Sequence, residues 1–137
     1  MTVLMIHGTA TVPMATRTVL VMGANSPTTT AIVDITNASR LMLTANTTTA
    51  TGLIDHGLGP TPVVVKLDRA SLRHDIVTDR ETIGSTYTTL GSSRGLTIGG
   101  AVRQAANSRW LYMAAWYGTK AEIADAEISS LLKAMGW

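Results

Sequence analysis

Residues 102–135 read VRQAANSRWLYMAAWYGTKAEIADAEISSLLKAM and carry the clearest structural signals of the chain. The apolar and aromatic run WLYMAAWY, at the end of residues 102–117, predicts a β-strand. Thr119 and Glu122 then form a capping box, which predicts the start of a helix. Gly136 is suited to end that helix. Between these signals, apolar residues recur at the spacing of one helix face, and we expect them to pack against another surface: Ile128, Leu131, Leu132 and Met135.

Strand signals also fill the first two thirds of the chain, where short runs of β-branched residues alternate with turn residues. We expect strands at residues 2–7, 16–24, 30–36, 40–47 and 62–69. Clusters of Gly, Pro, Asn and Ser separate them, so an antiparallel meander is the simplest topology. Residues 79–100 are rich in Gly, Ser and Thr and predict a long loop, which in a compact domain is usually functional or disordered.

The composition fits one domain, residues 1–137, with a single hydrophobic core. Hydrophobic residues make up 45% of the chain and charged residues only 15%, which suggests a surface partly buried against copies of the same chain. The net charge of +2 is a weak basic bias. Cysteine is absent, which excludes disulfides and Cys-based zinc sites. We find no pattern typical of a secretory signal or a membrane span, and expect a cytoplasmic protein without a membrane partner.

Two stretches carry a resemblance to a known family. Residues 102–135 are similar to the last strand and capped helix of the coat proteins of single-stranded RNA bacteriophages, and RTVLVMGANSPTTTAIVDI at 17–35 resembles their strand–turn–strand unit. The resemblance implies an α+β fold, with an N-terminal β-hairpin, a mainly antiparallel sheet, and a C-terminal helix or helices packing across an interlocked dimer. Homodimers would then assemble into an icosahedral shell around single-stranded RNA, in a virion made in the bacterial cytoplasm.

The same resemblance implies sites for RNA and for subunit contacts. Polar residues alternating along a central strand, and a basic residue on its neighbour, would hold an RNA stem-loop. On the last strand, Ala106 replaces the family's stacking Tyr, and Trp110 or Tyr112 is the alternative platform unless it is a core residue. The implied RNA-binding residues are Arg40, Thr44, Asn46, Thr48, Lys66, Ser108 and Trp110, with Arg17 added on position alone. The implied inter-subunit loop residues are Thr86, Tyr87 and Arg94.

The placement of the middle strands leaves an alternative open. LRHDIVTDRET, rather than VVVKLDR, is the other candidate for the basic strand and would bring Arg73 and His74 to the RNA face. The charged residues between Asp68 and Glu81 suggest a solvated strand edge, or else a band of inter-subunit salt bridges.

Catalysis is not expected. The pattern GSSRG at 91–95 matches a hydrolase nucleophile elbow, but its flanks lack the required strand and helix. The three histidines lack metal-ligand spacing. We therefore expect no enzyme activity, no cofactor, no metal and no small-molecule substrate.

The alternative function is a small β-rich oligomeric module that binds a carbohydrate or a peptide through its Thr-rich face. The coat-protein interpretation depends on one premise, that the apolar stripe of the C-terminal helix is covered by a second copy of the chain. A stable monomer would contradict it.

Overall fold

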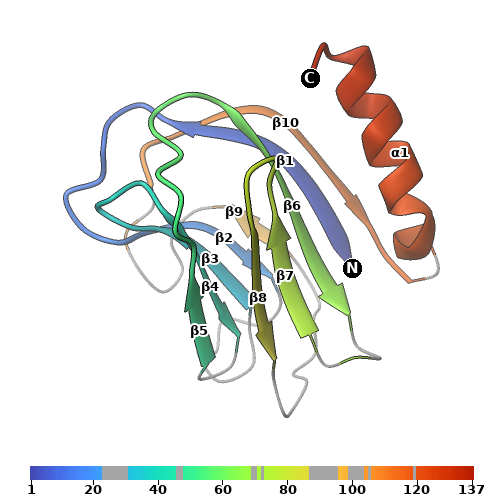
Figure 1. The fold of residues 1–137 in the computed structure, drawn as a ribbon, viewed down its shortest axis with the longest axis horizontal. Helices are drawn as coiled ribbons and strands as arrows, with labels where there is room; N and C mark the ends of the chain where they lie inside the picture. The colour runs from blue at the N-terminus through green and yellow to red at the C-terminus, as the bar shows by residue number, and fades with distance from the viewer. Residues whose placement is uncertain are drawn as a thin grey trace.

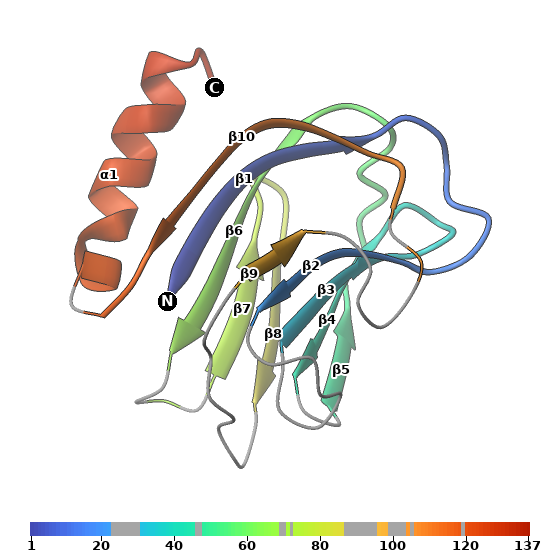
Figure 2. The same ribbon diagram turned by 180° about the vertical axis from the view of Figure 1, so that it is seen from behind.

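The computed structural model describes residues 1–22, 31–45, 48–68, 71, 73–86, 96–98, 104, 106–118 and 120–137. Their strands form two antiparallel five-stranded sheets (Figures 1 and 2). Sheet A contains β1 (Thr2–Thr9), β6 (Thr61–Asp68), β7 (Arg73–Val77), β8 (Thr82–Thr86) and β10 (Ser108–Trp116), in the spatial order β10–β1–β6–β7–β8. Sheet B contains β2 (Arg17–Met22), β3 (Ala31–Ile35), β4 (Leu41–Ala45), β5 (Thr48–Thr51) and β9 (Leu96–Ile98), in the order β5–β4–β3–β2–β9.

The hydrophobic core lies between the two sheets. Alternate residues of each strand point into it, since successive side chains of a strand face opposite sides of the sheet. Thus Val3 and Met5 of β1 enter the core from sheet A, whereas Leu41 and Leu43 of β4 enter it from sheet B. The strand β8 also contacts β4 and β5, which brings the two sheets together along one side. The fold is therefore a β-sandwich.

The helix α1 (Lys120–Ala134) lies on the outer face of sheet A, beside β10 and β1 and away from sheet B (Figures 1 and 2). Ala124 and Ile128 pack on Leu4, which points out of sheet A on the side opposite Val3 and Met5. Ile128 is only 6% exposed in the single chain. The predicted interlocked dimer is therefore wrong, because the outer face of the helix's own sheet covers the buried part of the apolar stripe.

The other residues of the predicted apolar stripe are buried against sheet A to different extents. Leu131 and Leu132 are half-buried beside the Leu4 cluster, whereas Met135 is exposed. Within the described residues, no helix is long and apolar enough to cross a membrane.

The predicted α+β fold with an N-terminal hairpin is also wrong. The hairpin would pair residues 2–7 with residues 16–24, but β1 pairs with β6 and β10, whereas β2 pairs with β3 and β9 in the other sheet. Every residue of β1 is buried. A strand that is apolar on both faces needs a cover on each side. Sheet B provides one cover for β1 and α1 provides the other.

The long predicted loop at residues 79–100 contains two strands, β8 and β9, which pair with β7 and β2. In the stretch LRHDIVTDRET, left open as an alternative, the described residues 73–82 form β7, the turn after it and the first residue of β8. The capping residue Thr119 and the segment ANSP lie outside the described residues.

Candidate functional site

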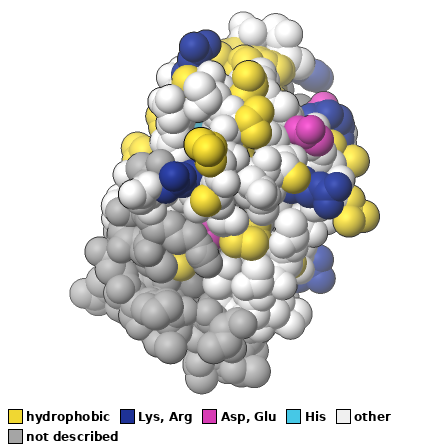
Figure 3. All heavy atoms as spheres, turned by 90° about the vertical axis from the view of Figure 1, so that its left-hand side faces the viewer, with side chains coloured by type: hydrophobic (Ala, Val, Ile, Leu, Met, Phe, Trp, Pro, Cys, Tyr) yellow, Lys and Arg dark blue, Asp and Glu magenta, His cyan; other side chains and the backbone are white. Residues whose placement is uncertain are grey.

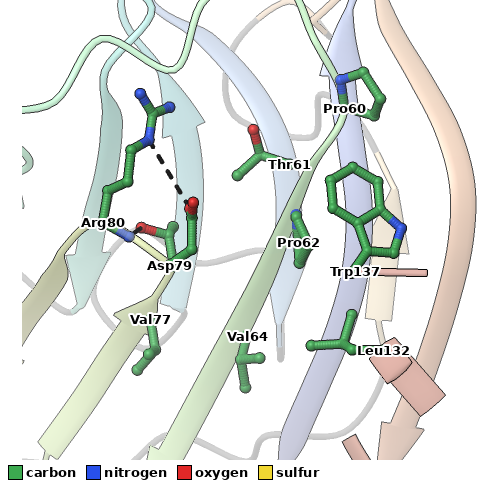
Figure 4. A pocket seen from close by; sticks show the side chains of 10 residues that line it. Pro60, Thr61, Pro62, Val64, Val77, Asp79, Arg80, Leu132 and Trp137 are labelled. Atoms are coloured by element: carbon green, nitrogen blue, oxygen red, sulfur yellow. Dashed lines mark hydrogen bonds and ion pairs between the residues drawn. The ribbon is translucent and has the colours of Figure 1, made fainter. Parts of the chain in front are cut away.

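A groove of about 460 Å³ lies on the outer face of sheet A, next to the C-terminal end of α1 (Figure 4). Three parts of the chain form it. β6 lies in the middle, the end of β7 with the following turn forms one wall, and the helix end forms the other. The lining includes Pro62 and Val64 from β6, Val77, Asp79 and Arg80 from the first wall, and Leu132 and Trp137 from the second.

The helix end places Trp137 in the groove. Gly136 adopts a φ of 82°, a left-handed conformation that glycine reaches at little cost. The Trp137 N–H donates to the Leu132 carbonyl (2.9 Å), and the Gly136 N–H donates to the Lys133 carbonyl (3.1 Å). These two bonds define a Schellman motif, which typically brings the residue after the glycine against the last turn of the helix. Leu132 and Trp137 accordingly line the same wall of the groove.

The helix-side half of the groove is apolar. The side chains of Pro62, Val64 and Leu132 lie close to the Trp137 indole (Figure 4). Trp137 remains 50% exposed, so a large aromatic surface is open to solvent. Binding sites for small molecules are usually lined by such apolar and aromatic groups, with a few polar groups that set orientation. This half of the groove can cover the apolar face of a ring-shaped ligand.

Charged groups form the opposite rim. Arg80 Nε lies 3.9 Å from Asp79 Oδ1, in a pair whose side chains are well exposed (Figure 4). Arg80 Nη2 also donates to His56 Nδ1 at 3.2 Å. A guanidinium carries five N–H donors, so Arg80 keeps several for a ligand that enters the groove. The rim can therefore bind hydroxyl oxygens or a carboxylate.

A half-buried carboxylate, Glu81, lies behind this rim. Glu81 Oε1 accepts a hydrogen bond from His56 Nε2 (3.0 Å), and Glu81 Oε2 accepts the backbone N–H groups of Leu53 (2.8 Å) and Ile54 (3.4 Å). The side chains of His56 and Glu81 are only 5% and 12% exposed. Glu81 therefore attaches the loop before β6 to the turn that carries Arg80.

These contacts set the protonation of Glu81. Burial alone would raise the pKa of Glu81. The hydrogen bonds from Leu53, His56 and Ile54 outweigh burial, and the net pKa lies below the ordinary value of 4.5. Because the pKa of Glu81 is lower in the folded chain than in the unfolded chain, ionised Glu81 stabilises the fold. This stabilisation is present above the ordinary pKa and is lost as the pH falls through the lowered pKa. The Glu81 carboxylate is ionised at neutral pH.

Replacing Glu81 tests this attachment. Glu81→Ala is expected to lower the free energy of unfolding by about 2 kcal/mol at pH 7, because it removes the charged acceptor of the loop's N–H groups. Urea denaturation monitored by circular dichroism would measure the change. Asp79→Ala is the control, since it removes an exposed carboxylate from the same turn and should cost less than about 0.5 kcal/mol. Equal effects in the two variants would contradict the role of Glu81.

The predicted RNA-binding residues are not brought together. Thr44 of β4 bonds the Thr49 hydroxyl of β5 (3.2 Å) on the outer face of sheet B, and Arg40 is exposed just before β4. Thr48, the first residue of β5, is exposed but lies on the other side of the sheet, since it pairs with the buried Ala45. Lys66 of β6 instead pairs with Asp125 of α1 (2.6 Å), on the outer face of sheet A. The two faces are on opposite sides of the sandwich, so one RNA stem-loop cannot cover both. Asn46, Tyr87 and Arg94 lie outside the described residues, and Thr86 ends β8.

The two predicted residues of the last strand point toward the interior. Ser108 Oγ bonds His7 Nε2 at 2.8 Å, and Trp110 is half-buried on the core, with its ring centroid 4.9 Å from that of His7. Burial lowers the pKa of His7 to about 4. Trp110 is thus a core residue rather than a stacking platform.

The other basic candidates lie in separate places. Arg17 bonds the Gln104 side chain and lines a second, smaller hollow of about 270 Å³ with Met14 and Asn107. Arg73 pairs with Asp75 on its own strand (2.8 Å). On the side of the molecule opposite α1, uncharged and acidic groups separate the Lys and Arg side chains (Figure 3). The described basic residues visible on that face form no continuous patch there.

A second histidine, His74 of β7, is buried as His7 is, with the same effect on its pKa. His74 is 6% exposed, and burial lowers its pKa to about 4 although Asp75 opposes the shift. Within the described residues, no group of three or more His, Asp or Glu side chains could hold a metal ion.

Comparisons with known proteins support the sandwich. The CBM40 domain of the Ruminococcus gnavus IT-sialidase has a similar structure, with a TM-score of 0.58 and 15% identity, over 82% of this chain and 72% of that one. The chain has the β-sandwich fold of that domain. The same domain bound to alpha2,3 sialyllactose gives a TM-score of 0.57 and 17% identity, over 77% of this chain and 67% of that one.

A leech intramolecular trans-sialidase, complexed with 2,7-anhydro-Neu5Ac, gives a TM-score of 0.52 and 15% identity, over 77% of this chain and 19% of that chain. No family model matches the sequence, and no curated protein matches it. At these identities the likeness establishes the fold alone.

The comparisons overturn the resemblance to phage coat proteins, since the neighbours are β-sandwich domains of sialidases. The homodimer, the icosahedral shell and the packaged RNA were implied by that resemblance and are wrong with it. We also expected no small-molecule partner, whereas neighbouring structures hold a sugar. The virion location stays an untested prediction. The carbohydrate-binding alternative is the one that the findings favour.

Sequence reasoning missed the groove. Trp137 and Pro62 were not considered for binding, and Arg80 was assigned to a solvated charged edge. One signal was present, because a glycine that stops a helix and is followed by a large aromatic predicts a Schellman contact with the last turn.

Proposed function

We propose that this chain is a carbohydrate-binding module that binds a glycan in the groove between α1 and sheet A, without catalysis. The observation that carries the proposal is the half-exposed indole of Trp137, which lies on an apolar strip across the groove from the Arg80 guanidinium. The sandwich fold, similar to that of sialidase CBM40 domains, supports it.

The groove matches the two-sided chemistry of a sugar ring. A pyranose presents C–H groups on its faces and hydroxyl groups around its edge. An aromatic side chain such as Trp137 can cover one face at a low cost in conformational entropy. The volume of about 460 Å³ falls within the usual range for small-molecule sites. A terminal sugar residue of a longer glycan is therefore the expected occupant.

Arg80 favours an acidic sugar. Guanidinium–carboxylate hydrogen bonds are charge-assisted and about twice as strong as neutral ones. A neighbouring structure holds sialyllactose, a glycan that ends in an acidic sugar. We accordingly propose a carboxylate-bearing terminal sugar as the preferred ligand, with Arg80 as the group that recognises its charge.

The groove also suits binding without turnover. Enzymes that hydrolyse glycosides generally use a pair of carboxyl groups on either side of the bond that breaks. Among the described residues that line the groove, Asp79 supplies the one side-chain carboxylate, and it pairs with Arg80. Incubation with sialyllactose should therefore leave the sugar intact.

Calorimetric titration with 3′-sialyllactose and with lactose tests the proposal. Trp137→Ala is expected to weaken binding of both sugars about tenfold, a loss of about 1.4 kcal/mol. Arg80→Gln should weaken sialyllactose binding and leave lactose binding nearly unchanged, because only the first carries a carboxylate.

Tyr117→Ala is the matched control, since Tyr117 is another aromatic side chain with 50% exposure but does not line the groove. If neither sugar binds the unaltered protein, or if Tyr117→Ala weakens binding as much as Trp137→Ala, the groove is not a glycan site.

A further inference from the structure

The hydrogen bonds behind the groove run in one direction. Arg80 Nη2 lies 3.2 Å from His56 Nδ1, and an arginine can only donate. His56 Nδ1 must therefore be the acceptor and carry no proton. The proton of the neutral ring then sits on Nε2, which donates to Glu81 Oε1 at 3.0 Å. Glu81 is ionised at neutral pH and can only accept, so all three residues agree on a single arrangement of protons.

The His56 ring is fixed from several sides. Its side chain is 5% exposed, and its backbone N–H donates to the Ser39 carbonyl at 3.0 Å. The Glu81 carboxylate that orients Nε2 is itself held by the N–H groups of Leu53 and Ile54. A ring held in this way presents its Nδ1 lone pair at a constant position, toward Arg80.

Among the residues that the structure describes, Arg80 has one other charged contact, the long pair with Asp79. Its side chain is 44% exposed, and Asp79 is 3.9 Å from Nε, beyond ordinary hydrogen-bond distance. A long side chain that must be ordered when a ligand binds costs affinity, and a contact that orders it beforehand reduces that cost. The His56 contact is of this kind, because it uses one Nη2 proton and leaves other donors for a ligand.

We propose that His56 is a positioning residue: as its Nε2–H tautomer it accepts from Arg80 and holds the guanidinium at the rim of the groove, ready for the carboxylate of an acidic sugar. This rests on the proposed function, because the ligand is the glycan proposed above. His56 does not itself line the groove and acts through Arg80.

Two substitutions distinguish the contact of His56 Nδ1 with Arg80 from the contact of His56 Nε2 with Glu81. In His56→Asn, the amide oxygen can take the place of Nδ1 and accept from Arg80, but Glu81 loses its donor. In His56→Gln, the amide N–H₂ can take the place of Nε2 and donate to Glu81, but Arg80 loses its acceptor. We expect His56→Asn to keep sialyllactose affinity within about twofold and His56→Gln to weaken it about threefold to tenfold.

Stability should follow the opposite order. His56→Asn deprives the half-buried Glu81 carboxylate of a partner, so it should unfold at a lower urea concentration than His56→Gln. A residue with a structural role alone would change affinity and stability in the same order, and that result would overturn the proposal. In an Arg80→Gln background, the two His56 variants should bind sialyllactose equally, and a persisting difference would also overturn it.

Nitrogen-15 NMR of the protein without sugar keeps this test independent of the proposed function. The expected spectrum shows His56 with a protonated Nε2 and an unprotonated Nδ1 at neutral pH. The Arg80 Nε–H signal should be ordered in the unaltered protein and in His56→Asn, and mobile in His56→Gln. A protonated Nδ1 on a neutral ring, or an Arg80 signal that is equally ordered in both variants, would overturn the positioning role. If no sugar binds, the proposed function fails and these spectra alone decide the role of His56.

Discussion

Acidification from pH 6.5 to pH 4 is expected to lower the free energy of unfolding by about 3 kcal/mol through His7 alone. His7 is 4% exposed, and burial lowers its pKa from 6.5 to about 4. The unfolded chain therefore takes up a proton at a higher pH than the folded chain does. The stability contributed by the neutral ring is complete above pH 6.5, decreases as the pH falls toward 4, and changes little below that.

Urea denaturation at pH 7, 5.5 and 4 measures this effect by comparing the unaltered protein with His7→Gln. The glutamine amide can take the place of Nε2 beside Ser108 Oγ but has no titrating group, so the variant should lose about 3 kcal/mol of the pH dependence. His74→Gln is the companion variant, since it removes the second buried imidazole and should leave the His7 contribution in place. A His7→Gln variant with the full pH dependence of the unaltered protein would mean that the folded chain protonates His7 freely.

Ile128→Ala is expected to lower the free energy of unfolding by about 2–4 kcal/mol. Ile128 is 6% exposed and packs on Leu4, so truncation leaves a cavity between α1 and sheet A that the surroundings can fill only in part. Urea denaturation measures the loss. Ser129→Ala, one position along on the exposed side of the same helix, is the control and should change stability by less than about 0.5 kcal/mol.

Protein concentration provides the second part of this test. Because the helix is covered within one chain, the loss caused by Ile128→Ala should be the same at low and high protein concentration. A midpoint of denaturation that rises with concentration would show that the helix is covered by a second copy instead.

The strands and the helix were largely predictable, because each depends on local chemistry. The run LMLTA at β4 alternates buried and half-buried residues, and the β-branched runs of β3 and β6 favour extended backbone. The short strands β5, β8 and β9 were missed. β5 and β8 are rich in Thr, Ser and Gly, and β9 has three residues, so none of them carries an apolar pattern long enough to predict a strand.

The pairing of the strands was not predictable from these patterns. Hydrophobic periodicity indicates which side of a strand is buried but not which strand lies beside it. β1 pairs with β10, about a hundred residues away in sequence, and with β6 rather than with its nearest neighbour. The coat-protein resemblance depended on the order of the elements and on short motifs. The same order is compatible with a single sheet and with two.

The groove was beyond sequence analysis for a similar reason. Pro62, Arg80 and Trp137 each belong to a segment that looks unremarkable alone: a proline near a strand start, a charged turn and a residue after a helix stop. The three residues come together only when α1 packs on the outer face of sheet A. Conversely, Thr44 and Lys66 looked like one surface in the sequence and lie on opposite faces of the sandwich.

The Schellman turn at Gly136 makes the helix end part of the ligand's environment. If a sugar rests on Trp137, it adds contacts that exist only while α1 is docked, and by thermodynamic linkage it must favour the docked state. Saturation with the right glycan should then slow hydrogen exchange in the last turn of α1 as well as at β6. The rate of hydrogen exchange at the C-terminal end of α1 would thus report how much of the protein has bound sugar, without any label on the sugar.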